Sequence, residues 1–203
     1  MKTDRPFSES CERNKIPILS ILRTVFDSPG TVLEIGSGTG QHAVHFGAEM
    51  PHLNWQTSDL PENHEGICQW LEDARLPNVL PPIILDVTGA WPEMEFDGIF
   101  TANTLHIMSW EAGQKLIAGA ARALGTGGKL VIYGPFNQGG SYTSESNARF
   151  DEWLKARDAR SAIREFEAVN ECARLAGFDL SADHAMPANN RLLVFSLITC
   201  QKE

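Results

Sequence analysis

Three glycines at alternate positions mark the stretch of this sequence best suited to hold a cofactor. Gly36, Gly38 and Gly40 follow an apolar run, Thr31–Ile35, and precede a helical pattern that begins at Gln41. Glycine allows a sharp turn and lets the backbone approach a ligand that any Cβ would obstruct. Unpaired N–H groups at the start of the following helix can face the same ligand. The spacing therefore predicts a strand, a tight turn and a helix start beneath a bound cofactor.

The same spacing distinguishes between cofactor classes. A dinucleotide fingerprint, G-x-G-x-x-G, that starts at Gly36 requires glycine or alanine at position 41, where the sequence has Gln41. This residue counts against a nicotinamide-dependent oxidoreductase. A glycine-rich turn without any ligand is the other alternative, although the strand–turn–helix context favours a binding role.

Two aspartates stand where predicted strands end. Asp59 ends the alternating run Leu53–Leu60, about twenty residues beyond the glycine turn, where a carboxylate can accept hydrogen bonds from both ribose hydroxyls. A surface carboxylate, or a helix cap before Pro61, is the alternative. Asp86 ends the third predicted strand, which starts at Pro81, and there an Asx-turn or a helix cap is the alternative.

A histidine after the fourth predicted strand offers general-base chemistry. The apolar segment that starts at Phe96 has a polar tail containing Thr101, Asn103, Thr104 and His106. Ligands of open α/β sheets bind at the carboxyl edge, where this tail emerges. Histidine can take a proton from an oxygen or nitrogen nucleophile near neutral pH. A packing role at a helix start, or contact with the cofactor, is the alternative for His106.

A turn-rich stretch, residues 134–144, follows the fifth predicted strand. A long loop of this kind can close over an active site as a lid, while a loop that only wraps the surface is the alternative. Its lid candidates are Phe136, Asn137, Ser141 and Tyr142. Tyr133 and Asn137 are, after His106, the next candidates to act on a substrate.

The remaining pattern supplies the elements that must position these residues. Strand and helix patterns alternate, which predicts an α/β fold with a doubly wound, Rossmann-like, mostly parallel sheet of seven strands and helices on both faces. A helix with apolar residues from Ile16 to Phe26 precedes the first strand, capped by Ser8 or Ser10, with Pro17 in its first turn or at a break. This helix can cover a cofactor pocket, although a solvated helix start is the alternative. Its candidate wall residues are Arg5, Ser8, Glu9, Arg13, Asn14 and Lys15.

Two strand patterns close the sequence. Phe178–Met186 and Arg191–Ile198 are separated by a short stretch that contains Asn189 and Asn190. Asparagine tolerates positive φ, so the pattern predicts a C-terminal antiparallel β-hairpin. Arg191 near the hairpin tip is a candidate to grip a substrate carboxylate.

Composition narrows the class of partner. The net charge of −9 and the lack of any basic run argue against a nucleic-acid partner, because such binding depends on Lys and Arg at phosphates. Cys11, Cys68, Cys172 and Cys200 are scattered, so no zinc or other metal site is expected. An apolar leader and an 18-residue apolar run are both lacking, which predicts a cytoplasmic protein without a membrane partner.

The stretch Glu34-Ile-Gly36-Ser-Gly38-Thr-Gly40 resembles the first motif of class I S-adenosylmethionine-dependent methyltransferases. The resemblance extends over about residues 10–200. It implies that Gly36, Ser37, Gly38 and Gly40 line the methionine side of the cofactor, and that Glu34 also belongs to the cofactor site. It further implies that Asp59 with Leu60 holds the ribose, that Asp86 with Val87 holds the adenine, and that the segment with Asn103 passes under the methyl donor. Finer features, among them Tyr133-Gly-Pro-Phe-Asn137 and Met186-Pro-Ala-Asn-Asn-Arg191, look like the methyltransferase-like protein 26 family.

These observations predict one domain over residues 1–203, with an N-terminal helical cap (1–28) and a core (29–203). The expected function is methyl transfer from S-adenosylmethionine, which leaves S-adenosylhomocysteine, to a small-molecule acceptor. His106, Tyr133 and Asn137 are the catalytic candidates, and Asn14, Phe136, Tyr142 and Arg191 are the candidates for substrate binding. A non-catalytic scaffold that binds the cofactor or a partner is the alternative. The acceptor and the oligomeric state are left open.

Overall fold

A computed structural model describes residues 5–198 of the chain; Cys200 lies outside them. The strands are β1 (Gly30–Ile35), β2 (Leu53–Asp59), β3 (Val79–Ile84), β4 (Phe96–Ala102), β5 (Leu124–Asn137), β6 (Arg164–Glu165), β7 (Phe178–Met186) and β8 (Asn190–Leu197). The α-helices are α1 (Glu9–Val25), α2 (Gln41–Glu49), α3 (His64–Ala74), α4 (Trp110–Ala123), α5 (Glu145–Arg157) and α6 (Phe166–Leu175). Two short 3₁₀ helices are η1 (Pro61–Asn63) and η2 (Pro187–Asn189).

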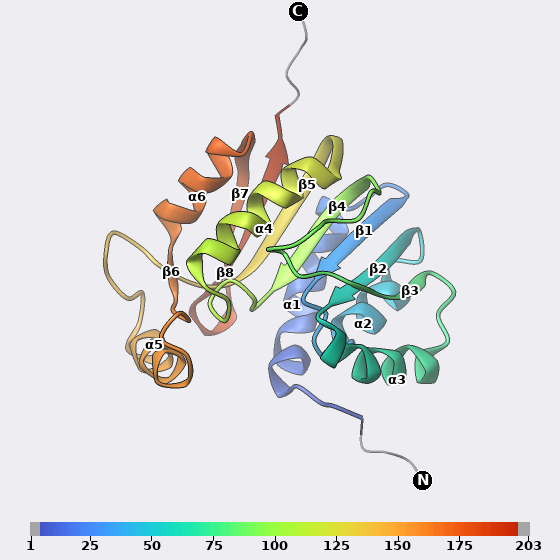
Figure 1. Cartoon of the computed structure of the whole chain (residues 1–203), viewed down its shortest axis with the longest axis horizontal. Helices are drawn as coiled ribbons and strands as arrows, with labels where there is room; N and C mark the ends of the chain where they lie inside the picture. Colours follow the sequence, from blue (N-terminus) through green and yellow to red (C-terminus); the bar gives the residue numbers. More distant parts are fainter. Residues whose placement is uncertain (1–4, 199–203) are drawn as a thin grey trace, which may run out of the picture.

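The strands form one sheet in the order β3-β2-β1-β4-β5-β8-β7 (Figure 1). β1 to β5 pair in parallel, whereas β8 is antiparallel to both β5 and β7. The predicted seven-strand path and its C-terminal hairpin are therefore confirmed, and the two-residue β6 pairs with β5 as an addition. The chain changes direction between β1 and β4, and ligands of such sheets bind beyond the strand ends at this point.

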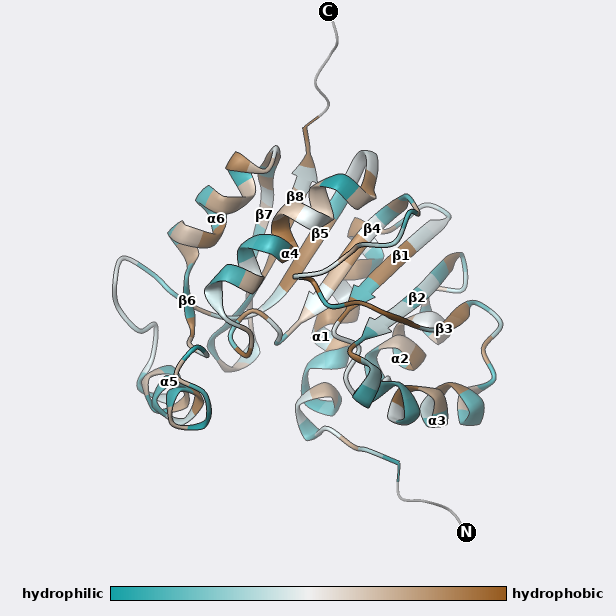
Figure 2. Ribbon diagram, viewed as in Figure 1, coloured by the Kyte–Doolittle hydropathy of each residue, from teal (hydrophilic) through white to brown (hydrophobic). Residues whose placement is uncertain are grey.

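Both faces of the sheet are covered, which is why its strands are apolar on both sides. Leu33 and Ile35 of β1 pack in a core cluster with α4 and α6, whereas Val32 packs in a second cluster with α1 and α2. Figure 2 shows hydrophobic strands at the centre and hydrophilic residues along α5 and the outer side of α3. These two clusters hold the strands in place from both faces. The polar side chains of the candidate site lie at the carboxyl ends of those strands.

Helix α1 begins at one of the two predicted N-caps, but Pro17 does not lie where the sequence pattern predicts. Ser8 is its N-cap, and its side chain accepts from the Cys11 amide at 3.4 Å. Pro17 therefore lies well inside the helix, not in its first turn, and does not end it. Although proline lacks an amide donor, the buried residues Ile18 and Leu22 that follow it hold the helix against the sheet.

The bounds of two strands, β3 and β5, differ from the sequence prediction. β3 begins at Val79 and ends at Ile84, so Asp86 lies two residues beyond the strand. β5 continues to Asn137, because β8 pairs with it as far as Pro135 and β6 pairs with its last two residues. Phe136 and Asn137 are consequently buried strand residues rather than parts of a lid.

The hairpin turn also differs in detail from the prediction. Ala188 and Asn189 have positive φ, whereas Asn190 has φ −89° and already belongs to β8. The hairpin forms as predicted, with Asn189 and not Asn190 in the left-handed region.

Candidate functional site

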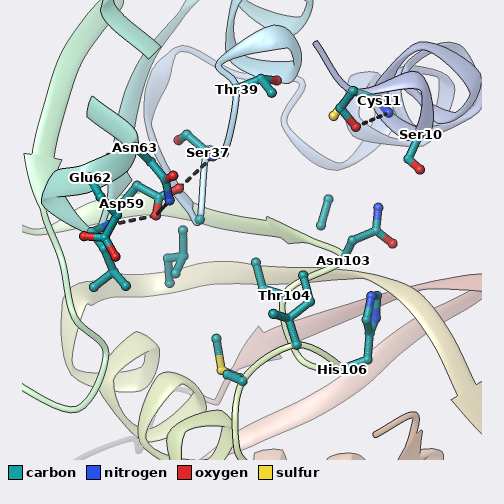
Figure 3. A pocket seen from close by; sticks show the side chains of 18 of the residues that line it. Ser10, Cys11, Ser37, Thr39, Asp59, Glu62, Asn63, Asn103, Thr104 and His106 are labelled. Atoms are coloured by element: carbon teal, nitrogen blue, oxygen red, sulfur yellow. Dashed lines mark hydrogen bonds between the residues drawn. The ribbon is translucent and has the colours of Figure 1, made fainter. Parts of the chain in front are cut away.

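A cleft of about 1240 Å³ opens at the carboxyl edge of the parallel strands. Its wall is formed by the loops that follow β1, β2, β3 and β4, together with the start of α1 and one face of α5. Nine of the predicted cofactor-binding and catalytic residues line it: Gly36, Ser37, Gly38, Asp59, Leu60, Asp86, Val87, Asn103 and His106. Figure 3 shows Asp59 and Asn63 on one side of this space, and Asn103, Thr104 and His106 on another.

The glycine turn is held by β2. The amides of Gly36 and Ser37 both donate to the carbonyl of Ser58, at 3.1 and 3.0 Å. Gly36, Gly38 and Gly40 have φ of 72°, 58° and 88°, a region that residues with a Cβ seldom adopt. A Cβ on Gly36 would lie 2.5 Å from the Thr104 side chain, whereas a Cβ on Gly38 would meet no atom within 4 Å. Gly38 thus leaves open space over the turn, on the side of the cleft.

Asp59 is the polar centre of this half of the cleft. It is 8% exposed, and its Oδ1 accepts from the Leu60 amide and the Asn63 side chain, both at 2.7 Å. Its Oδ2 accepts from the Gly38 amide at 2.7 Å. A carboxylate oxygen has two lone pairs, so the described residues fill both of those on Oδ1 and one on Oδ2. The carboxylate is held in place and keeps an acceptor position for a ligand hydroxyl.

Asp86 is arranged differently. Its Oδ1 accepts from both the amide and the hydroxyl of Thr88, at 2.8 Å each, which is the Asx-turn named above as the alternative. The Thr88 amide is the main reason that the pKa of Asp86 is lowered. Asp86 also lines the cleft beside the buried Leu85 and Val87, so the turn and a ligand contact are compatible at this position.

His106 lines the part of the cleft to which α5 contributes. It is 5% exposed, and its ring meets that of Phe150 edge-on, with 5.2 Å between centroids. Burial, with a smaller contribution from the charge of Arg164, lowers the pKa of His106 to about 4. The imidazole is therefore neutral at pH 7 and can accept a proton, but this pKa makes it a weaker base than the near-neutral histidine that the sequence predicts.

Arg164 is a site residue that the sequence did not reveal. Its guanidinium donates to the carbonyls of Leu105, at 3.0 Å, and of Met108, which flank His106 in the chain. The Ala162 amide donates to the His106 carbonyl at 3.1 Å. The segment before and within β6 thus fixes the loop that carries His106. The donors and acceptors are more than fifty residues apart in sequence, so no local pattern could have shown these bonds.

Gln41 is a second residue whose role only the structure shows. Its Oε1 accepts from the Ser8 amide and from the Thr39 hydroxyl, at 2.5 and 3.0 Å, and its Nε2 donates to Glu12 at 2.9 Å. The residue that departs from the dinucleotide fingerprint therefore ties the start of α1 to the glycine turn. As a result Ser8, Ser10 and Cys11 of the N-terminal segment line the cleft.

Other predicted residues do not line the cleft. Glu34 lies beneath the glycine turn, 2% exposed, and accepts from the Trp55 indole at 3.1 Å. Arg191 forms a bidentate ion pair with Asp183, with Nε–Oδ1 at 2.7 Å. The remaining predicted residues outside the lining are Gly40, Asn14, Tyr133, Phe136, Asn137 and Tyr142, together with the wall candidates Arg5, Glu9, Arg13 and Lys15.

Several of these residues have other partners. Tyr133 is buried in the cluster on the α1 side of the sheet, and burial raises the pKa of its hydroxyl. Asn14 holds the ring of His42, a residue of the cleft wall, at 2.7 Å. Tyr142 donates to Asp151 at 2.8 Å. Arg191 and Tyr142 are thus already paired within the protein.

Within residues 5–198 no three His, Cys, Asp or Glu side chains are grouped so that they could hold a metal ion. No helix in this part of the chain is long and apolar enough to cross a membrane.

Solved structures share this fold. An O-methyltransferase family protein from Burkholderia thailandensis is 17% identical with a TM-score of 0.84, over 95% of this chain and 59% of that one. SibL, an S-adenosylmethionine-dependent methyltransferase, is 22% identical with a TM-score of 0.78, over 93% of this chain and 56% of its own. PigF, solved with SAH, is 18% identical with a TM-score of 0.78, over 91% of this chain and 56% of its own. The present chain therefore spans less than two thirds of the length of these proteins.

The chain thus has the fold of these solved structures, an α/β sheet that ends in an antiparallel hairpin, with the strand order given above. The chain belongs to the family described as "Protein of unknown function (DUF938)", which matches residues 5–197. These comparisons do not support the finer assignment to the methyltransferase-like protein 26 family.

Proposed function

We propose that this protein is an S-adenosylmethionine-dependent methyltransferase that acts on a small molecule. The observation that carries the proposal is the pairing of Gly38 with Asp59 at the carboxyl edge. An amide beside open space is bonded to a carboxylate that keeps one acceptor position. The structural neighbours named as methyltransferases, one of them solved with SAH, support the same cofactor.

The described residues suit this cofactor. Asp59 is placed to accept from ribose hydroxyls, Leu85 and Val87 offer an apolar surface for adenine, and the turn at Gly36–Gly38 leaves room for the amino-acid part. When bound, S-adenosylmethionine supplies a methyl group on a sulfonium. The protein then aligns an acceptor with that methyl group and excludes water. His106 takes a proton if the acceptor atom carries one.

The decisive experiment is a calorimetric titration with S-adenosylhomocysteine, with NADH as a separate ligand. We expect S-adenosylhomocysteine to bind and NADH not to bind. Asp59→Ala should weaken the binding about 10- to 100-fold, because a hydrogen bond to a charged group contributes about 1.5–3 kcal/mol. Asp59→Asn keeps the shape of the side chain but not its charge. Its affinity for S-adenosylhomocysteine should fall between those of Asp59→Ala and the parent protein.

Asp179→Asn is the matched control, since Asp179 is exposed on β7 and does not line the cleft. Unchanged affinity in Asp59→Ala would refute the ribose role of Asp59. Absence of S-adenosylhomocysteine binding, from protein shown to carry no cofactor already, would refute the proposed function.

A second prediction concerns the open space at Gly38. Gly38→Ala and Gly139→Ala place a Cβ at similar φ, 58° and 60°, and neither new atom meets protein within 4 Å. Both variants should lose about 1 kcal/mol of unfolding free energy, the cost of positive φ. Only Gly38→Ala should also weaken S-adenosylhomocysteine binding, by about tenfold or more, because its methyl group enters the ligand space. Equal affinities in the two variants would contradict a ligand over Gly38.

The alternative is a protein that binds the cofactor or a partner without catalysis. Binding of S-adenosylhomocysteine with no turnover across a broad set of acceptors would favour this scaffold. The similarity to the methyltransferase-like protein 26 family and a single-domain organisation remain parts of the proposal. A cytoplasmic location is also part of the proposal, and the free thiols of Cys11, Cys68 and Cys172 are consistent with it.

A further inference from the structure

The half of the cleft that faces away from the glycine turn is built from one face of α5. Phe150, Trp153 and Arg157 are spaced three and four residues apart, so they lie on the same side of the helix. All three line the cleft, together with His106. Residues 134–144, where the sequence predicts a lid, do not line the cleft.

These four side chains form a continuous series. The rings of His106 and Phe150 are 5.2 Å apart and meet edge-on. Phe150 and Trp153 are stacked, with 5.8 Å between centroids and 17° between planes. The guanidinium carbon of Arg157 lies 4.6 Å from the centre of the Trp153 ring. The series runs from a buried base to an exposed cation.

Arg157 differs from every other charged residue of the cleft. Among the described residues that line the cleft it is the only lysine or arginine, whereas Asp59, Glu62, Glu65 and Asp86 lie on the cofactor side. Asp158, its neighbour, is held by Arg160 at 2.8 Å. No ion pair to Arg157 is found within residues 5–198, so its guanidinium donors are available to a ligand.

The surroundings of the series are apolar. Trp153 is 51% exposed and Ile107 is 60% exposed, and both line the cleft with Met108. Large apolar side chains left open beside a cleft are typical of surfaces that a ligand covers. An acceptor that lies along them gains apolar contact over most of its length and meets a positive charge at its outer end.

Resting on the proposed function, we propose that the methyl acceptor is a flat, largely apolar molecule with an anionic group. Its ring system lies along Phe150 and Trp153, and its carboxylate or similar anion binds Arg157. The nucleophilic atom at the opposite end then reaches His106. Arg157 is thus a specificity residue, since a planar guanidinium stacked on an aromatic ring is pre-organised for a carboxylate.

The test uses matched acids and esters as probes. 4-Hydroxycinnamate and 6-hydroxy-2-naphthoate, each beside its neutral methyl ester, are titrated into the protein with and without saturating S-adenosylhomocysteine. We expect each acid to bind about tenfold more tightly than its ester. Arg157→Gln should remove this preference. Arg157→Lys should retain part of it, because lysine keeps the charge but not the planar fork.

Arg149→Gln is the control, since Arg149 is an exposed residue of the same helix, paired with Glu145 and outside the cleft lining. It should leave the preference unchanged. Equal binding of acids and esters, an acid preference that survives in Arg157→Gln, or no acid binding up to the solubility limit would each overturn the inference. A separate titration with S-adenosylhomocysteine keeps this outcome distinct from the proposed function, because cofactor binding and turnover test that function and the acid preference tests only the role of Arg157.

Discussion

Glu34→Gln is expected to stabilise the protein at alkaline pH and to have little effect in mild acid. At pH 8.5 the variant should exceed the parent protein by about 3 kcal/mol in unfolding free energy, and at pH 5 the two should agree within about 1 kcal/mol. Urea denaturation at both pH values measures the difference.

The expectation follows from the burial of Glu34. Burial beneath the glycine turn raises the pKa of its carboxyl from 4.5 to about 7. Between these values the folded protein keeps a proton that the unfolded chain releases. The contribution of this group to stability is therefore full below pH 4.5 and is lost as the pH rises through 7. A glutamine is neutral at every pH, and its amide oxygen can still accept from the Trp55 indole.

The pH dependence distinguishes this cause from a general packing effect. Other titrating groups change the stability of both proteins equally, so the difference between parent and variant isolates Glu34. Glu93→Gln, at an exposed position, should show no such difference. A Glu34→Gln variant that is less stable than the parent at pH 8.5 would show that the ionised carboxylate, not its neutral form, is the one that the fold accommodates.

His106→Asn is the second substitution for which we expect a large effect, here on the rate of turnover. If His106 is the base, turnover with an acceptor whose nucleophile is protonated should fall about 10²- to 10⁴-fold, the usual contribution of such a group. Affinity for S-adenosylhomocysteine should be unchanged, because the ring lies in the half of the cleft formed by α5. Formation of S-adenosylhomocysteine over time measures the rate, and calorimetry measures the affinity.

The dependence of kcat/KM on pH distinguishes a role of His106 as the base from a purely structural role. The pKa of His106 is lowered to about 4, so its protonation should not reduce kcat/KM between pH 8 and pH 6. An acidic limb should appear only as the pH approaches 4. His184→Asn, at a half-buried position on β7 outside the cleft, is the control. A rate within threefold of the parent in His106→Asn, or an acidic limb near pH 6.5 that the variant retains, would rule out His106 as the base.

Local chemistry explains why much of the fold was predictable. Strands and helices have periods of two and 3.6 residues, and these periods are written in neighbouring positions. The turn at Gly36–Gly40 needs positive φ, which only glycine adopts readily, so its place could be read directly. The boundaries of β3 and β5 were misplaced because strand ends depend on the partner strand. The pairing of β5 with β8 and β6 lies between distant segments.

The site divides in the same way. The cofactor half, with Gly38 and Asp59, follows directly after predicted strands, and parallel strands must end at one edge. The loop that carries His106 and the wall supplied by the start of α1 depend instead on contacts between residues far apart in the chain, such as Arg164 with Leu105 and Gln41 with Ser8. Such contacts leave no periodic or spacing signal.

By itself the sequence determined the order and type of the elements, the glycine turn and the carboxylates at the strand ends, since backbone conformation and strand direction are local properties. Only the tertiary structure decided that Glu34 is buried below the turn, that Arg191 is paired with Asp183, and that α5 supplies the wall opposite the cofactor. The physical reason is that burial and pairing depend on which distant side chains the packed sheet brings within contact distance.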